Sequence, residues 1–286
     1  MLKLMPQDIS ERLFTSTVWL AAAVIASVLC WILGDVFIKG ISHLSWSFLF
    51  EEPSNSGRNG GIGTILHSTL LILLVALAVS VPLGLSIAVW LAEFTSKRSS
   101  KLRSVVRVVL DVLAGVPSIV YGLFGNAFFC IYLGLGFSIL SGGLTLACMI
   151  LPIFIRTCET GLRVVNDEWR RGAFALAMSR TSMIWYVLLP AASPAIAAGL
   201  ILGIGRATAE TAALIFTSGY VDRSPESLLD SGRALAVHIY DLSMNVTGGD
   251  DAAYASALVL ISVIVVLNAL AQTFTDKWFS RKVSVV

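Results

Sequence analysis

Six long apolar segments constrain the fold of this chain more than any other feature of its sequence. They lie at about 14–38, 64–92, 105–133, 137–160, 194–219 and 253–275. A helix needs about 20 apolar residues to cross the hydrocarbon of a bilayer, and each segment is long enough. Only 13% of the 286 residues are charged, whereas a soluble domain carries about a quarter. The sequence therefore predicts an all-α integral membrane protein with six transmembrane helices.

Composition and spacing argue against several other classes of protein. The net charge of +2 is too small to indicate nucleic-acid binding, and no basic stripe is present. Four cysteines fall inside apolar segments: Cys30, Cys130, Cys148 and Cys158. They lack CxxC spacing, so we expect small core residues, and the three histidines have no spacing typical of metal ligands. The segment from Phe14 to Ile38 is too long for a signal peptide and is predicted to be an uncleaved span.

The positions of Lys and Arg predict the orientation of the chain. One side carries 14 of the 20 basic residues: Lys3, Arg12, Lys97, Arg98, Lys101, Arg103, Arg107, Arg163, Arg170, Arg171, Arg180, Lys277, Arg281 and Lys282. The opposite side has Lys39, Arg58, Arg223 and Arg233. Cytoplasmic loops carry the excess of basic residues, so both termini are predicted to be cytoplasmic. The third and fourth spans are joined by an uncharged turn at 134–136, and the fifth and sixth by an acidic external loop at about 220–252.

The cytoplasmic connection between the fourth and fifth spans is long and contains helix signals. Asn166 can cap a helix, and the two acidic residues that follow it suit the positive end of the helix dipole. A helical run from Trp169 to Met178 is predicted, then a turn, then an apolar helix from Met183 that stops at Pro190. One interpretation is an interfacial helix lying on lipid. The other is a docking element for a cytoplasmic partner.

This connection resembles the cytoplasmic motif of ABC importer permeases, in which EAA precedes three residues, Gly, nine residues and I-x-L-P. Here Arg171-Gly172-Ala173 is followed in register by Ala177 and by a run that ends at Pro190. Other stretches are similar to the phosphate permease PstA family: Gly60 to Ile62, Val81 to Gly84, Leu91 to Phe94, Pro117 to Phe124, Ile155 to Glu159 and Arg206 to Leu214. The resemblance covers about residues 60–276.

The sequence departs from the family pattern at four positions. Arg171 stands where the family has Glu, which reverses a charge at the expected ATPase contact. Ala177 stands at the Gly position, and Gly at a turn adopts backbone angles that Ala adopts only with strain. Ala209 and Ala213 replace the usual Gly and Pro of the G-E-T-A-P-L run. We therefore expect the coupling helix to bend differently from that of the family.

Arg206 and Glu210 are the first candidates for the transport pathway. They lie near the middle of the fifth predicted span, four residues apart and so on one helical face. A charge near the bilayer centre costs about 2.5–3.5 kcal/mol on insertion scales, so such residues are rarely accidental. Arg206 would offer several donors to an oxyanion, and Glu210 would orient it or bind a proton-bearing phosphate oxygen. The alternative is a structural ion pair between these two side chains.

Further candidates lie in the third and fourth spans. Arg156 and Glu159 sit near the cytoplasmic end of the fourth, where a pathway role competes with a simple pair at a helix end. Asp111 in the third span has the same two interpretations. Pro117-Ser118 is predicted to kink the third span at a cavity wall, against the alternative of simple packing.

The resemblance implies a type I ABC importer permease domain at 64–276, with coupling helices at about 166–190. An N-terminal segment at 1–63 would hold the first span and an external loop, and 277–286 would form a cytoplasmic tail. The chain would be the permease subunit of an ATP-driven phosphate importer in the bacterial inner membrane, forming half of the pathway. It has no Walker-type GxxxxGK[ST] sequence, so ATP and Mg²⁺ are expected on separate ATPase subunits and no cofactor on this chain.

The implied partners are a second permease resembling PstC, two ATPases resembling PstB and an external phosphate-binding protein resembling PstS, besides membrane lipid. The nearest alternative is a permease for another oxyanion, such as molybdate, sulfate or a phosphonate. A secondary transporter that needs no ATPase is a further alternative. An intramembrane enzyme is the last, although no HExxH, paired aspartates or GxSxG-like nucleophile is found within the spans.

Overall fold

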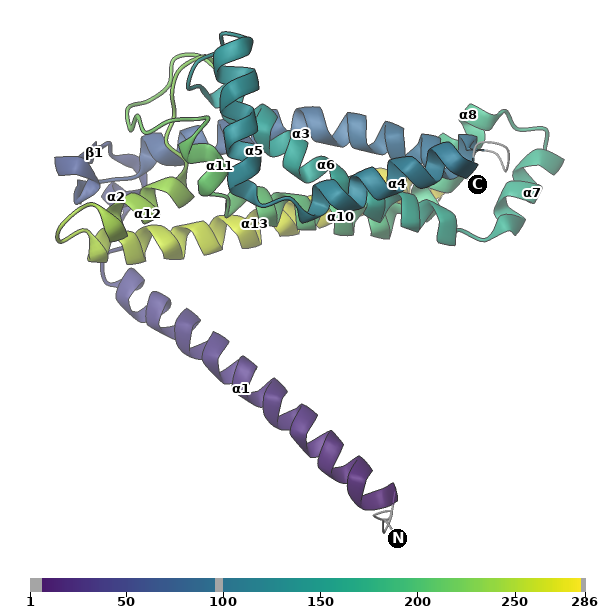
Figure 1. Cartoon of the computed structure of the whole chain (residues 1–286), viewed down its shortest axis with the longest axis horizontal. Helices are drawn as coiled ribbons and strands as arrows, with labels where there is room; N and C mark the ends of the chain where they lie inside the picture. Colours follow the sequence, from purple (N-terminus) through teal and green to yellow (C-terminus); the bar gives the residue numbers. More distant parts are fainter. Residues whose placement is uncertain (1–6, 96–99, 284–286) are drawn as a thin grey trace.

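The computed structural model describes residues 7–95 and 100–283, most of which are helical (Figure 1). Four helices are long and apolar enough to cross a membrane unbroken. They are α1 (Gln7–Ile41), α3 (Gly63–Val89) with its π-helical extension η2 (Trp90–Phe94), α6 (Ile139–Val164) and α13 (Asp250–Val283). Two bent helix pairs meet the same test, which makes six crossings if each pair is one span.

The first bent pair joins α4 (Ser100–Gly115) to α5 (Ser118–Gly125) and its π-helical continuation η4 (Asn126–Tyr132), at an angle of 99°. The second has an angle of 69°. It runs through α8 (Arg180–Met183), the π-helical turn η5 (Ile184–Leu188) and α9 (Leu189–Ala191) into α10 (Ser193–Thr208). Five of the six predicted spans are found, the third as the first bent pair. The fifth, predicted at 194–219, shares only α10 with the second bent pair, whose first half lies in the connection predicted as cytoplasmic.

The core of the bundle lies where α3, α6 and α10 pack together. α6 is the most enclosed of these helices, with Leu146, Ile150 and Phe154 fully buried. A Cβ built at Gly143 would lie 2.5 Å from Cγ1 of Val75 on α3, so only glycine permits this approach. Small residues drive helix contact in membranes in this way, because close backbones gain van der Waals contact.

α1 stands apart from the rest of the bundle (Figure 1) and none of its apolar window is buried. It contacts α13 near its C-terminal end, where Lys39 donates a hydrogen bond of 3.2 Å to the hydroxyl of Tyr254. Its apolar surface is therefore available to lipid or to another subunit. Cys30 lies exposed on this helix, so the prediction that it is a core residue is wrong; Cys130 and Cys158 are buried.

A small cap of short elements covers one end of the bundle. It contains α2 (Trp46–Phe50), β1 (Pro53–Ser54), η1 (Asn55–Gly57), β2 (Asn59–Gly60) and α12 (Leu235–Met244). β1 and β2 pair antiparallel, with Pro53 opposite Gly60. Phe48 and Leu242 pack with the start of α3 and of α13 beneath the cap. All five elements fall in segments that were predicted only as external loops.

His238 is buried at the centre of this cap. Its Nδ1 lies 3.4 Å from Nη1 of Arg233, which in turn pairs with Oδ2 of Asp241 at 3.3 Å. Burial, together with the positive charge of Arg233, lowers the pKa of His238 to about 4. The imidazole is therefore neutral at physiological pH.

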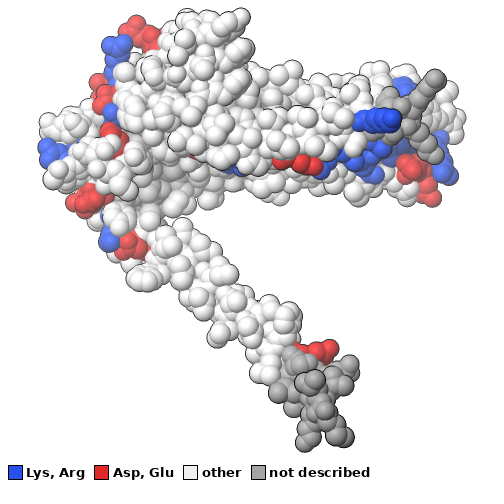
Figure 2. Space-filling view, in the orientation of Figure 1, with Lys and Arg blue, Asp and Glu red and all other residues white. Residues whose placement is uncertain are grey.

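The N-terminal end of α1 and the C-terminal end of α13 both lie towards the end of the bundle opposite the cap (Figure 1). An even number of crossings requires this arrangement. Figure 2 shows the charged residues gathered towards the two ends, with a largely uncharged surface between them. Lys3, Lys97 and Arg98, which contributed to the predicted orientation, lie outside the described residues. The cytoplasmic placement of the termini stays a prediction from charge.

Candidate translocation and coupling site

The segment predicted as the fifth span is broken near its middle. α10 ends at Thr208, and the short helix α11 (Ala212–Ile215) begins after three intervening residues. Glu210 has left the helix at this break, so its side chain does not continue the helical face that carries Arg206. Among the described residues no ion pair joins these two side chains. The prediction of a shared face, and of the alternative ion pair, is therefore wrong.

Glu210 caps α11 instead. Its Oε1 accepts a hydrogen bond of 3.1 Å from the backbone N–H of Ala213. An acceptor at this place satisfies one of the free N–H groups of a helix start, and its negative charge suits the helix dipole. The sequence signal for this cap was Glu210-Thr211 directly before an apolar run, which is typical of a helix start.

Arg206 is left at the break without a carboxylate partner. Its side chain is half-buried, and its Nε atom is buried and forms no hydrogen bond. Arg206 is the last basic residue on α10, in the final turn of the helix. A cation there is favoured by the negative end of the helix dipole.

The predicted kink at Pro117-Ser118 is confirmed. α4 and α5 meet there at 99°, and Pro117 has extended backbone angles with ψ of 143°. Proline lacks an N–H and disfavours a helical residue before it, so the helix ends at Gly115. The hydroxyl of Tyr121 donates 2.9 Å to the carbonyl of Leu113 and ties the two halves together. The place of this kink on a cavity wall stays a prediction.

The two broken spans pack against each other. α5 contacts α11, and Nδ2 of Asn126 donates a hydrogen bond of 2.8 Å to the carbonyl of Phe216 just beyond α11. Helix breaks at membrane depth are tolerated where protein buries them or where they line a cavity, because the freed backbone groups need partners. The region around Arg206 and these breaks is the candidate translocation site.

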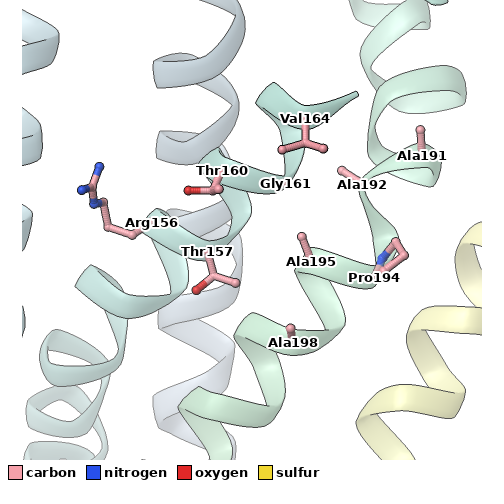
Figure 3. Close-up of a pocket in the computed structure, with 10 residues that line it drawn as sticks. All are labelled: Arg156, Thr157, Thr160, Gly161, Val164, Ala191, Ala192, Pro194, Ala195 and Ala198. Carbon is pink, nitrogen blue, oxygen red and sulfur yellow. The ribbon is translucent and has the colours of Figure 1, made fainter. Parts of the chain in front are cut away.

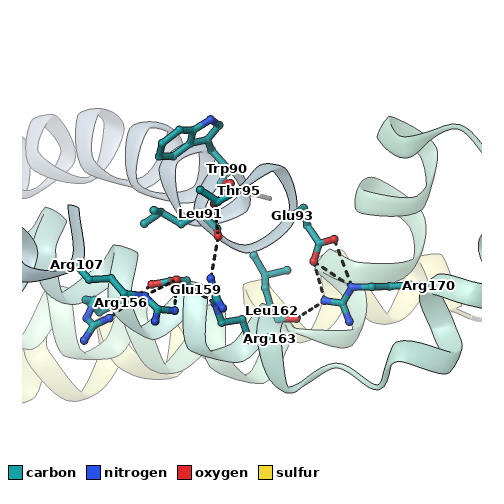
Figure 4. A network of polar contacts seen from close by, with 10 residues as sticks. All are labelled: Trp90, Leu91, Glu93, Thr95, Arg107, Arg156, Glu159, Leu162, Arg163 and Arg170. Carbon is teal, nitrogen blue, oxygen red and sulfur yellow. Dashed lines mark hydrogen bonds and ion pairs between the residues drawn. The ribbon is translucent and has the colours of Figure 1, made fainter. Parts of the chain in front are cut away.

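A second polar region surrounds Glu159 near the other end of α6 (Figure 4). The carboxylate is 1% exposed, and its Oε1 accepts from Nη2 of Arg107 at 2.5 Å and from Nε of Arg163 at 3.0 Å. Nη1 of Arg156 lies 3.7 Å from Oε2. Three arginines therefore surround one buried acid, which ties α4 to α6. The sequence predicted the pair with Arg156 but missed Arg107, which is 52 residues away in the chain.

Arg156 also lies on an open pocket of about 630 Å³ between α6 and the bend from α9 to α10 (Figure 3). Thr157 and Thr160 line the pocket on the α6 side, and Pro194 and Ala195 line it on the other. Nη2 of Arg156 lies 3.0 Å from Oδ1 of Asp111, so its charge is paired at the edge of the pocket. A role for Arg156 and Glu159 in the pathway stays a prediction.

The predicted coupling segment begins with α7 (Asp167–Ala175). The side chain of Asn166 accepts from the N–H of Glu168 at 3.0 Å, which confirms the predicted cap. The helix ends in a Schellman turn, because Met178 N–H donates to Ala173 and Ala177 N–H to Phe174, both at 3.0 Å. Ala177 therefore occupies the position of the left-handed residue, with φ of 52°.

The turn at Ala177 bears on the departure from the family pattern. An L-residue other than glycine pays about 1–2 kcal/mol in this conformation. The chain keeps the turn that glycine would favour and holds alanine in it under strain, as the substitution at this position predicts. Arg171 and Gly172 are exposed beside it, whereas Ala173 is buried.

The end of the coupling segment differs from the prediction. The helix does not stop at Pro190 but continues through α9 to Ala191 and bends at Ala192. Pro190 lies in α9, just after the π-helical turn η5 and two residues before the bend at Ala192. Its side chain is buried, so it serves as a packed residue within the bend.

Sequence reasoning missed one contact of the coupling helix altogether. Nη2 of Arg170 on α7 lies 2.7 Å from Oε1 of Glu93 on η2, across 77 residues of chain. The same guanidinium donates to the carbonyl of Leu162 at 2.8 Å (Figure 4). It also donates to the carbonyl of Val165 at 2.7 Å.

Among residues 7–95 and 100–283, no group of three or more His, Cys, Asp or Glu side chains could hold a metal ion.

Comparison with known proteins places this arrangement in a family. The profile described as binding-protein-dependent transport system inner membrane component matches residues 80–285. Probable ABC transporter permease protein YqgI of Bacillus subtilis is 33% identical over 277 residues, which span 91% of this chain and 94% of that protein. Phosphate transport system permease protein PstA 2 of Mycobacterium bovis is 27% identical over 283 residues, 95% of this chain and 91% of that protein.

A solved structure supports the same fold. A chain in the crystal structure of a bacterial ABC transporter involved in alginate import matches with a TM-score of 0.60 and 16% identity, over 93% of this chain and 99% of that chain. The chain belongs to the family of binding-protein-dependent transport system inner membrane components, as a type I ABC importer permease related to the PstA proteins and a multi-pass protein of the bacterial inner membrane.

Proposed function

We propose that this permease carries phosphate and that Arg206 contacts the anion on its way through the membrane. The observation that carries the proposal is a guanidinium at a helix break without a carboxylate partner, with a buried and unpartnered Nε. A charged residue within a span costs several kcal/mol unless its surroundings use it. An anion that passes the break would receive charge-assisted hydrogen bonds from this guanidinium.

The names of several relatives support phosphate over other anions. PstA 2 of Mycobacterium bovis and PstA of Mycobacterium leprae are both described as phosphate transport system permeases. YqgI, at 33% identity, carries no substrate in its name. Another oxyanion, such as sulfate or molybdate, is therefore the alternative that the experiment must separate from phosphate.

The exposed apolar side chains of the coupling segment support the proposal that a separate ATPase binds there. α7 exposes Trp169 and Phe174, each about half accessible, and the residue just after it, Leu176, is 77% exposed. Apolar side chains gathered at the end of a membrane bundle are suited to bind a soluble protein. We propose that separate ATPase subunits dock on residues 166–190. The permease domain at 64–276 would form half of the pathway and a second permease the other half, and an external binding protein would deliver phosphate.

The test is uptake of radiolabelled phosphate into vesicles that contain the assembled complex, with and without ATP. Sulfate and molybdate are added in excess as competitors. Arg206→Ala is compared with Arg223→Ala, which removes an arginine from the external loop and serves as the matched control. The proposal predicts uptake that needs ATP, resists both competitors, and is lost in Arg206→Ala but not in the control.

Three results would contradict separate parts of the proposal. Uptake of sulfate or molybdate in place of phosphate would overturn the substrate and leave the permease assignment intact. Phosphate uptake that persists in Arg206→Ala at the wild-type rate would overturn the role of Arg206. Uptake that proceeds without ATP would contradict the role of the ATPases.

A further inference from the structure

We infer that the ion pair between Arg170 and Glu93 is the mechanical link through which the coupling helix moves the membrane bundle. The inference rests on the proposed function, because it assumes that an ATPase acts on α7. Arg170 belongs to α7, and Glu93 belongs to η2, the final turn of the crossing helix α3. The two residues are positioning residues, since neither lies at the candidate translocation site.

The geometry of the pair suits the transmission of force. Nη2 and Nε of Arg170 lie 2.7 and 3.2 Å from Oε1 of Glu93, and Nε lies 3.3 Å from Oε2. A planar guanidinium held by several bonds to one carboxylate has a fixed orientation, whereas a lysine would make a single point contact. The hydrogen bond with Glu93 raises the pKa of Arg170, so its charge is secure.

The pair is well shielded from water. The side chains are 18% exposed for Arg170 and 10% exposed for Glu93. A solvent-exposed ion pair contributes little, because water and salt screen it, but removal of one partner from a shielded pair leaves the other charge unsatisfied. The second ion pair of Arg170, with Asp167, uses a carboxylate that is 78% exposed and is therefore the weaker contact.

α7 has few other attachments to the bundle. Of its nine residues only Ala173 is buried and only Arg170 is half-buried; the rest are exposed. Figure 4 shows the side chain of Arg170 reaching from its helix towards Glu93 and the carbonyl of Leu162. Arg170 thus binds the end of α3 and the end of α6 at once, and a displacement of α7 must act on both helices.

A second contact continues the link within the bundle. Nη2 of Arg163 donates to the carbonyl of Leu91 on η2 at 3.0 Å, and its Nε binds Glu159. Through Glu159 the same region reaches Arg107 on α4. The end of α3, the C-terminal part of α6 and the middle of α4 are therefore joined, and Arg170 is where α7 enters this polar network. Motion of α7 can in this way reach α4, whose C-terminal end bends into α5, the helix that packs against α11.

The first test compares transport with ATP hydrolysis in the complete complex reconstituted with its binding protein. Glu93→Gln removes the charge and keeps the shape of the side chain; Arg170→Gln removes the other partner. Asp35→Asn is the control, because it breaks an exposed ion pair with Lys39 on α1. We expect either variant to lower the number of phosphate ions carried per ATP about tenfold, as the loss of a charge-assisted bond implies.

The double variant and the conservative variant separate coupling from mere stability. If the pair acts as one link, Glu93→Gln with Arg170→Gln carries as little phosphate per ATP as either single variant. Arg170→Lys keeps the positive charge and should carry more phosphate ions per ATP than Arg170→Gln, although fewer than the wild type. A ratio that stays at the wild-type value in both single variants, with transport and hydrolysis unchanged or reduced in parallel, would overturn the inference.

The second test needs no transported substrate, so it remains valid if the phosphate assignment fails. Spin labels are attached at Ser86 on α3 and Glu168 on α7, both exposed, with Cys30 replaced by alanine. The inference predicts one narrow distance distribution between the labels that is the same with and without ATP, and a broadened one in Glu93→Gln. A distance that changes with ATP in the wild type, or one that stays narrow in Glu93→Gln, contradicts the link. Absence of phosphate uptake by the wild type would overturn only the proposed function.

Discussion

Oε1 of Glu210 accepts a hydrogen bond of 3.1 Å from the backbone N–H of Ala213 and thereby caps α11 at the break in the fifth crossing. The carboxylate is committed to this cap, and among residues 7–95 and 100–283 no carboxylate pairs with Arg206 four residues earlier. A cation of this kind attracts an anion, whereas a self-contained ion pair would not. The break thus changes the sequence-based hypothesis of a charge pair into one of an unpaired positive charge.

The role of Glu210 as a cap can be separated from a role of its charge. Glu210→Gln keeps an acceptor for Ala213 and should retain most of the transport activity. Glu210→Ala loses the cap, which costs about 1 kcal/mol, and should lower both thermal stability and transport. Uptake rate and melting temperature are measured on the same preparations. Loss of transport in Glu210→Gln without loss of stability would show that the charge itself is needed.

The strain at Ala177 predicts a stabilising substitution. Ala177→Gly relieves a left-handed residue and should stabilise the end of α7 by about 1 kcal/mol. Ala175→Gly is the matched control, because Ala175 lies within α7 and glycine there should destabilise the helix by about 0.5–1 kcal/mol. Amide hydrogen exchange of residues 167–178 measures both effects. Faster exchange in Ala177→Gly than in the wild type would contradict the strain.

Removal of Glu159, the buried acid that three arginines surround, should lower the free energy of unfolding more than removal of the exposed Asp111. Glu159→Ala leaves the guanidinium groups of Arg107 and Arg163 without their carboxylate and should destabilise the chain by about 3 kcal/mol. Asp111→Asn removes an acid that is more than half exposed and should cost less than about 1 kcal/mol. Thermal unfolding in nanodiscs compares the two. Equal losses would mean that burial of Glu159 contributes nothing to its effect.

The buried imidazole in the cap predicts a dependence of stability on acid pH. The pKa of His238 is about 4 in the folded chain against an ordinary value of 6.5, so the unfolded chain binds a proton that the folded chain does not. Stability is therefore fully present above pH 6.5 and is lost as the pH falls from 6.5 towards 4, by up to about 3 kcal/mol. Thermal melting between pH 7.5 and 4 measures this loss.

Variants of two histidines assign the effect. His238→Gln should flatten the dependence in this range. His43→Gln is the control, because that ring is about half exposed at the same end of the molecule, and it should leave the dependence in place. The assignment fails if the His238→Gln and wild-type curves run parallel.

Local signals predicted a large part of this fold. Apolar length located five of the six crossings, proline at 117 located the bend between α4 and α5, and Asn166 with its two acidic neighbours located the start of α7. These features depend on residues close together in the chain. Their physical causes, the thickness of the bilayer, the missing N–H of proline and the free N–H groups of a helix start, are all local.

The features that were missed depend on contacts between distant parts of the chain. Glu93 meets Arg170 across 77 residues, and Arg107 meets Glu159 across 52. No spacing rule pairs such residues, because the pairing is set by how α3, α4 and α6 pack. The fifth crossing shows a different failure. Its apolar length favoured one continuous helix, in which the four-residue spacing would place Arg206 and Glu210 on one face. The chain instead starts a new helix after Glu210-Thr211, as the cap signal there indicates.

The most direct test of the account is the initial rate of ATP-driven phosphate uptake by Arg206→Ala and Arg206→Lys in the assembled complex. The account predicts a loss of tenfold or more, on the order expected for a charge-assisted hydrogen bond, in Arg206→Ala. Arg206→Lys keeps a positive charge at the break and should recover part of the rate. Wild-type uptake by Arg206→Ala would contradict the account, since the anion would then pass the break without the positive charge of Arg206.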